Sequence, residues 1–223
     1  MSIERPMKLV VFGASGATGQ WLVRLAVERG HQVTAPMREG ASAVVAQGGV
    51  DVVRGDPLDA AFVDRAVTNK DAVVTALGLR YRHGHNPFSS VVSPPTLLSQ
   101  SVAHMLAAMK RHSVSRISMV SAAGVGDSRK KVAWPLRVLF RISNIRVDYE
   151  DLARAEALLA VSGLDWQAVR PTTLTNGAST GARRVLRYSV TMRTARADVA
   201  RFMLDQLEQP RFEERTPMIS GLV

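Results

Sequence analysis

The sequence predicts an α/β fold built on a doubly wound parallel sheet in one domain. Short runs rich in valine and isoleucine alternate with segments of helical length along most of the chain. Runs that are apolar throughout, rather than at every second residue, are typical of parallel strands covered on both faces. Their alternation with helices predicts βαβ units with right-handed crossovers. The 223 residues are enough for one domain, 1–223, with a substantial core.

The elements follow one another in a regular order. Strands are expected over Lys8–Gly13, Gln32–Met37, Val50–Gly55, Asp71–Leu77, Arg116–Ser121 and Trp166–Pro171. Helices are expected over Ala17–Arg29, Ala41–Gln47, Asp59–Val67, Pro95–His112 and Asp148–Val161. Several of these helical segments are followed directly by glycine, the usual residue just past the end of a helix.

The regular alternation ends after Pro171, and residues 172–221 are expected to form a small extension on the substrate side. The polar segment 172–184 predicts a loop, 185–190 a short strand, 195–209 an amphipathic helix and 216–221 a last strand. Val199, Phe202, Met203 and Leu207 share one face of that helix.

A glycine-rich turn, "GASGATG" from Gly13 to Gly19, joins the first strand to the first helix. Gly13 permits a tight turn, Gly16 permits a pyrophosphate to approach the backbone, and Gly19 permits close packing of helix on sheet. The free N–H groups of the first turn, from Ala17 and Thr18 onward, favour an anion there. The hydroxyls of Ser15 and Thr18 add donors. A glycine turn without a ligand is the alternative, but the position between strand and helix favours a dinucleotide site.

The glycine spacing, G-x-x-G-x-x-G, resembles that of the short-chain dehydrogenase/reductase superfamily in its atypical, NAD(P)H-binding (NmrA-like) branch. The stretches "VVRGDPLD", "SPPTLLSQSVAHMLAAMKRHSV", "VSAAGV", "LLAVSGLDWQAVRP" and "ARADVARFML" extend the resemblance over nearly the whole chain. Within the branch it is strongest to the NADPH-dependent flavin and biliverdin reductases of type B. The resemblance implies a Rossmann-like fold and an oxidoreductase.

Arg38 follows the second strand, where an NAD enzyme would carry a carboxylate for the ribose hydroxyls. A guanidinium pairs with a 2′-phosphate, which a carboxylate would repel. We therefore expect NADPH as the cofactor. In the alternative, Arg38 is a solvated surface charge and Glu39 binds the ribose.

By resemblance, Asp56 and Pro57 line the adenine pocket, although Asp56 could equally cap the next helix. Leu77 and Gly78 would let the cofactor pass close to the backbone. The turn after the last long strand, with Pro171 and Thr172, would contact the nicotinamide end, the alternative being a structural turn with Arg170 in an ion pair. All these positions lie at carboxyl ends of strands, where ligands bind in open α/β sheets.

Many superfamily members use a serine with a Y-x-x-x-K pair for proton transfer. Ser121 matches the serine and Tyr149 the tyrosine, but Ala153 stands where the lysine would be. Ser121 and Tyr149 are therefore the catalytic candidates. Ser121 would bond the nicotinamide or the acceptor, the alternative being that it caps a strand end. Without the lysine, hydride transfer to a planar acceptor (a flavin, quinone or tetrapyrrole) is favoured over alcohol oxidation. The alternative is an NmrA-like NADP-binding redox sensor without turnover.

The loop 79–95 lies at the same sheet edge, where Tyr81 and Phe88 could cover a planar acceptor. His83 and His85 form an H-x-H pair with no obvious third ligand, so no metal is expected. Trp134, Phe140 and Trp166 are expected in the core. Pocket shape depends on 79–95 and 124–147, where the sequence pattern is least informative.

The net charge is +10, but the basic residues are scattered and Arg129-Lys130-Lys131 is the one tight cluster. We therefore expect a solvated basic surface and no nucleic-acid partner. There is no cysteine, which excludes disulfides and thiolate sites. No apolar signal segment or membrane-length run is present, so a cytoplasmic protein without membrane contact is expected, as a monomer or homodimer.

Overall fold

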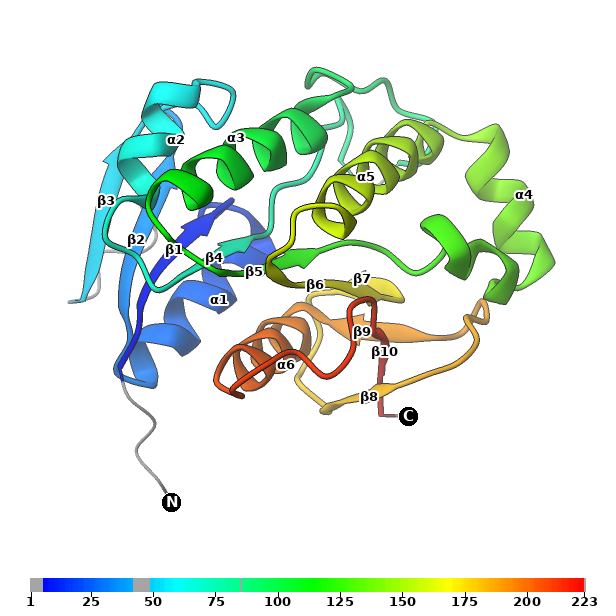
Figure 1. Ribbon diagram of the computed structural model, residues 1–223. Helices are drawn as coiled ribbons and strands as arrows, with labels where there is room; N and C mark the ends of the chain where they lie inside the picture. Colours follow the sequence, from blue (N-terminus) through cyan, green and yellow to red (C-terminus); the bar gives the residue numbers. More distant parts are fainter. Residues whose placement is uncertain (1–5, 42–48, 85, 223) are drawn as a thin grey trace.

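The computed structural model describes residues 6–41, 49–84 and 86–222. Its centre is an eight-stranded sheet in the order β3-β2-β1-β4-β5-β6-β10-β8, with a two-stranded sheet of β7 and β9 beside it (Figure 1). All neighbouring strands from β3 to β10 are parallel, and β8 pairs antiparallel with β10. The order 3-2-1-4-5-6 is that of a Rossmann-like doubly wound sheet, so the expected fold class is confirmed.

The strands are β1 (Lys8–Phe12), β2 (Gln32–Met37), β3 (Val50–Arg54), β4 (Ala72–Thr75), β5 (Arg116–Val120), β6 (Asp165–Pro171), β7 (Thr173–Thr175), β8 (Ala182–Arg184), β9 (Arg193–Ala195) and β10 (Met218–Gly221). The helices are α1 (Ala17–Glu28), α2 (Ala60–Val67), α3 (Leu97–Arg111), α4 (Trp134–Ile142), α5 (Ile145–Ala160) and α6 (Arg196–Leu207), with a 3₁₀ helix η1 at Gly126–Lys131.

Helices cover both faces of the sheet. Figure 1 shows α2, α3 and α5 on one side and α1 with α6 on the other. The apolar residues of each strand alternate between two buried clusters: Leu9 and Val11 of β1 pack with α1 and α6, whereas Val10 and Phe12 pack with α2, α3 and α5. This explains why the strands read as continuous apolar runs. No helix in the described parts of the chain is long and apolar enough to cross a membrane.

The predicted elements occur with shifts of one to three residues at their ends, except in three places. The helix expected over 41–47 lies almost wholly outside the described residues. The expected loop 172–184 contains β7 and β8. Residues 185–190 form no strand, and only an isolated bridge joins Tyr188 to Val132. The expected C-terminal extension is joined to the main sheet, because β10 lies between β6 and β8.

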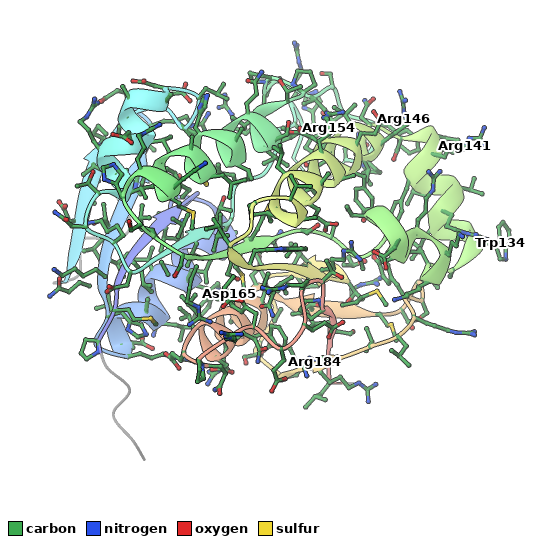
Figure 2. All side chains as sticks on the ribbon, viewed as in Figure 1. Trp134, Arg141, Arg146, Arg154, Asp165 and Arg184 are labelled. Carbon is green, nitrogen blue, oxygen red and sulfur yellow. The ribbon has the colours of Figure 1, made fainter. Side chains whose placement is uncertain are left out.

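Helix α4 and η1 were not predicted. Pro135 lies in the first turn of α4, where its missing N–H costs nothing. The helix has no fully buried residue, and Trp134 is 69% exposed, so its expected place in the core is wrong. Figure 2 shows Trp134 and Arg141 pointing away from the body of the protein. Trp166 is half-buried against the cluster beneath α2, α3 and α5.

Candidate active site

Two cavities adjoin at the carboxyl ends of the parallel strands, and Arg80 lines both. The first, of about 470 Å³, lies over β1, β2, β3 and β4 and includes eight predicted residues: Gly13, Ser15, Gly16, Arg38, Asp56, Pro57, Leu77 and Gly78. The second, of about 720 Å³, lies over β5 and β6 and includes four more: Ser121, Tyr149, Pro171 and Thr172. The first cavity spans the point between β1 and β4 where the strand order reverses, the usual ligand position in this fold.

The glycine turn has the geometry of a phosphate-binding turn. Gly13 has a positive φ of 80°, and a Cβ there would lie 2.7 Å from the carbonyl of Ala76. A Cβ on Gly19 would overlap the Gly13 carbonyl group. Gly16, the N-cap of α1, is extended and exposed, and no side chain caps this helix. The first-turn N–H groups, including those of Ala17 and Thr18, therefore have no partner within the helix and can bind an anion.

Arg38 lines the first cavity, whereas Glu39, the next residue, does not. Asp56 also lines the cavity, and its Oδ1 accepts the N–H of Leu58 at 2.9 Å. The N-cap of α2 is Asp59, which accepts the N–H of Ala61 at 2.9 Å. The alternative that Asp56 caps this helix is therefore wrong.

Behind Ser121 lies a buried network of charges. The Ser121 hydroxyl donates to Glu156 Oε1 at 2.6 Å. Arg170 binds the same carboxylate with two nitrogens, Nε at 3.0 Å and Nη2 at 2.6 Å, and its Nη1 donates to Asp127 at 2.6 Å. Arg170 is buried and joins the carboxylates of Glu156 and Asp127 through charge-assisted hydrogen bonds. The Ser121 proton is thus directed at Glu156, and toward the cavity Ser121 can offer its lone pairs.

Tyr149 walls the second cavity but directs its hydroxyl elsewhere. The hydroxyl donates to the carbonyl of Ala123 at 3.0 Å, and the ring packs on Phe140 with 4.8 Å between centroids. Burial raises the pKa of Tyr149 far above its ordinary value. Phe140, expected in the core, also lines the cavity, and Ala153 offers no charge that would lower the pKa of Tyr149. The serine–tyrosine–lysine arrangement for proton transfer is therefore absent from the described residues.

Asp148 was not predicted as a site residue, yet its side chain faces the second cavity. Its Oδ1 is buried and has no hydrogen-bond partner among the described residues, and the same is true of the hydroxyl of Tyr81. Burial raises the pKa of the Asp148 carboxyl to about 6; the neighbouring charge of Asp151 adds to the shift and the Leu79 N–H opposes it. The cavity therefore contains a carboxyl group that can hold a proton close to neutral pH.

The loop 79–95 forms one wall of the second cavity through residues that include Tyr81, Asn86 and Pro87. Phe88, expected to cover the acceptor, is instead 57% exposed. His85 lies outside the described residues, so the H-x-H pair is not placed. Within the described parts of the chain there is no group of three His, Asp or Glu residues arranged to hold a metal ion.

Some site residues carried no signal in the sequence. Arg80, Asp148 and Glu156 are single charged residues in a loop or a helix, and nothing in their spacing links them to Ser121 or to the glycine turn. One indirect signal existed for Asp148, since it directly precedes Tyr149. Conversely, Ala17, Thr18 and Gly19 are part of the predicted turn but not of the walls of either cavity.

The fold, the glycine turn and the adjoining cavities are those of a dinucleotide-binding protein. The chain belongs to the NAD(P)H-binding family, which it matches over residues 13–210. This membership confirms the expected relation to the atypical short-chain dehydrogenase/reductases and the expected NAD(P)H-type cofactor.

Solved structures share the fold at low identity. ChuY, an anaerobilin reductase from Escherichia coli O157:H7, is 24% identical, with 95% of this chain and 96% of that chain covered and a TM-score of 0.75. A short-chain dehydrogenase/reductase from Veillonella parvula in complex with NADP is 18% identical, with 96% and 94% covered and a TM-score of 0.76. A putative epimerase from Bacteroides thetaiotaomicron is 24% identical, with 98% and 99% covered and a TM-score of 0.77.

Proposed function

We propose that this protein is an NADPH-dependent reductase of flavins, quinones, tetrapyrroles or similar planar acceptors. The observation that carries the proposal is the junction of the two cavities at Arg80. One has the glycine turn and Arg38, and the other has mostly apolar walls and no tyrosine–lysine pair among the described residues. A nucleotide in the first and a ring in the second would meet near Ser121.

The residues of the first cavity fit an NADP molecule. The uncapped first turn of α1 suits the pyrophosphate, Arg38 suits the 2′-phosphate, and Asp56 and Pro57 suit the adenine. At Leu77 and Gly78 the cofactor can pass close to the backbone on its way to Pro171 and Thr172 in the second cavity. The space there is open, because a Cβ on Gly78 would meet no atom within 4 Å. Bound there, NADPH supplies a hydride, that is, two electrons and one proton.

The side chains of the second cavity orient the acceptor and supply the proton that its reduction needs in addition to the hydride. Reduction of a quinone to a hydroquinone needs one further proton, and Asp148 has a suitable carboxyl group on the cavity wall. The Ser121 hydroxyl donates its hydrogen bond to Glu156, so its oxygen can accept one from an N–H of the nicotinamide amide or of the acceptor. Tyr149 contributes an aromatic wall. Arg80 and Arg196 also line the cavity and suit acidic substituents, such as those of a tetrapyrrole.

A second candidate function is an NADP-binding redox sensor without turnover. The hydrogen bond from the Tyr149 hydroxyl to the Ala123 carbonyl favours a sensor, because the usual proton donor of the superfamily is then not available to a substrate. Nucleotide binding would be the same in both cases.

The experiment that separates them is the decrease of NADPH absorbance with FMN, menadione or biliverdin added. We expect oxidation well above the protein-free rate with at least one of these acceptors. Tight NADPH binding by calorimetry together with no oxidation above background would establish the sensor and exclude the reductase. Absence of binding would exclude both.

A further inference from the structure

Six of the ten large apolar side chains that are exposed among the described residues come from α4 and from two segments bonded to it. Trp134, Val138 and Ile142 of α4 are 69%, 48% and 64% exposed. They are four residues apart, so they form one stripe along the helix. We define the α4 patch as this stripe together with three exposed side chains of the adjoining segments: Phe88, Leu186 and Val190.

Hydrogen bonds hold these segments together. The N–H of Asn144 donates to the carbonyl of Pro87 at 2.8 Å, which joins the loop 79–95 to the end of α4. The N–H of Ala133 donates to the carbonyl of Tyr188 at 2.8 Å, which joins the segment 185–190 to its beginning. Figure 1 shows α4 at one end of the molecule, far from α1 and α2. These bonds place the segments that carry Phe88, Leu186 and Val190 next to α4, so the six exposed apolar side chains lie at the same end of the molecule.

Basic side chains lie on α4 beside the stripe and on the 3₁₀ helix before it. Arg137 and Arg141 lie on α4 itself, and Arg129, Lys130 and Lys131 come from η1 directly before it. None of these five has an acidic partner within ion-pair distance among the described residues. The acidic side chains nearby are already paired, Asp127 with Arg170 and Glu150 with Arg146. The surface thus combines exposed tryptophan and aliphatic groups with uncompensated positive charge.

We propose that the α4 patch binds the surface of an anionic phospholipid bilayer, with α4 lying in the interface. An exposed helix with an apolar stripe, a tryptophan and flanking arginines has the composition of interfacial helices, and clustered basic residues are attracted to anionic lipids. A second copy of the chain fits less well, because a two-fold contact through this surface would bring the positive charges of one copy close to the same charges of the other. The proposal departs from the expectation of no membrane contact, which considered only apolar runs along the sequence.

The opposite face of α4 faces the second cavity. Leu136, Leu139 and Phe140 line it, so one helix both walls the cavity and carries the stripe. If the proposed reductase function is correct, an apolar acceptor dissolved in the bilayer, such as a long-chain quinone, would reach the cavity directly from the membrane. This consequence rests on the proposed function, whereas bilayer binding itself does not.

Binding is tested by co-sedimentation of the full-length protein with vesicles. We expect binding to vesicles of phosphatidylglycerol and phosphatidylcholine, weak binding to phosphatidylcholine alone, and loss of binding in high salt. The double variant W134S/I142S should weaken binding at least about tenfold. Removing one positive charge in R137Q or R141Q should weaken it about fivefold each. V161S is the matched control, since Val161 is 83% exposed at the end of α5, outside the patch, and should change nothing.

No binding of the wild-type protein to anionic vesicles in low salt would overturn the proposal. A dimer that W134S/I142S converts to a monomer, without vesicle binding, would also overturn it and assign the patch to a second copy. NADPH oxidation by W134S/I142S with menadione, which has no isoprenoid chain, should equal that of wild type in buffer without vesicles, because neither residue lines the cavity. Its oxidation with a long-chain quinone in anionic vesicles should fall. If no quinone is reduced by wild type but vesicles are bound, the reductase function fails and the bilayer proposal stands.

Discussion

Arg38 and Glu39 are the two candidates for the residue that contacts the ribose and so selects the nucleotide. Both follow β2, but the first cavity is lined by Arg38 and not, among the described residues, by Glu39. A guanidinium beside the ribose favours a 2′-phosphate because the ion pair can be bidentate and partly shielded from water.

Replacing Arg38 with alanine is expected to raise the KM for NADPH about tenfold or more and to change that for NADH little. Steady-state kinetics with both nucleotides measure this. Glu39→Gln is the control, and it should alter neither constant. A loss in E39Q that is specific to NADH, with R38A unaffected, would instead assign the ribose to Glu39.

Replacing Asp148 is expected to change both the stability of the protein and its activity. Because burial raises its pKa to about 6, the folded protein holds this proton more tightly than the unfolded chain does. Its contribution to stability is thus full below about pH 4 and is lost as the pH rises through 6. Asp148→Asn should be more stable than wild type at pH 7.5, by up to about 3 kcal/mol, and similar at pH 4.

Urea unfolding at the two pH values measures that difference, and the same variant should reduce menadione more slowly. Glu150→Gln removes a charge from the exposed side of the same helix and should do neither. Equal stability of D148N and wild type at both pH values would show that the carboxyl group is not held in an environment that favours its neutral form.

The turn between β1 and α1 shows that three glycines in one element have different tasks. Gly13 and Gly19 lie against backbone atoms, so a side chain at either position has no space. At Gly16 a Cβ would meet one atom, the Gly13 oxygen, at 3.2 Å, and the backbone conformation suits any residue. Gly13 and Gly19 are therefore needed for the fold, whereas Gly16 leaves space for a ligand to approach the backbone.

Gly19→Ala is expected to lower the free energy of unfolding by about 3 kcal/mol, because the overlap with Gly13 outweighs the better helix propensity of alanine. Gly16→Ala should unfold near the wild-type temperature but bind NADPH more weakly. Thermal unfolding and calorimetric titration of both variants test the assignment. Equal loss of stability in the two variants would contradict the division of tasks.

Helix α4 is the longest of the elements that the sequence pattern failed to indicate. Its apolar residues occur on both faces, Leu136 and Phe140 toward the cavity and Val138 and Ile142 toward solvent. A helix is recognised from one apolar stripe against a polar background, and here the second stripe obscures the first. The same feature that hid the helix is the one that suggests a binding surface.

At the scale of the whole molecule, the strand order places both cavities, with twelve of the predicted site residues, at one edge of the sheet. The reversal between β1 and β4 opens the nucleotide cavity, and β5 with β6 supports the acceptor cavity next to it. The cluster Arg129-Lys130-Lys131, which the sequence shows, lies directly before α4, and Arg137 and Arg141 of α4 add two more cations to it. The net charge of +10 gives no sign of this grouping.

The fold class and the glycine turn could be read from the amino-acid order, whereas the other expected cofactor positions came from the resemblance to the superfamily. The first two depend on residues close together in the chain, whose spacing sets the local backbone. The pairing of Ser121 with Glu156, the orphaned oxygens of Asp148 and Tyr81, and the exposed face of α4 could not. Those features join segments far apart in the sequence, and they exist because helices pack on a sheet at positions that no short pattern encodes.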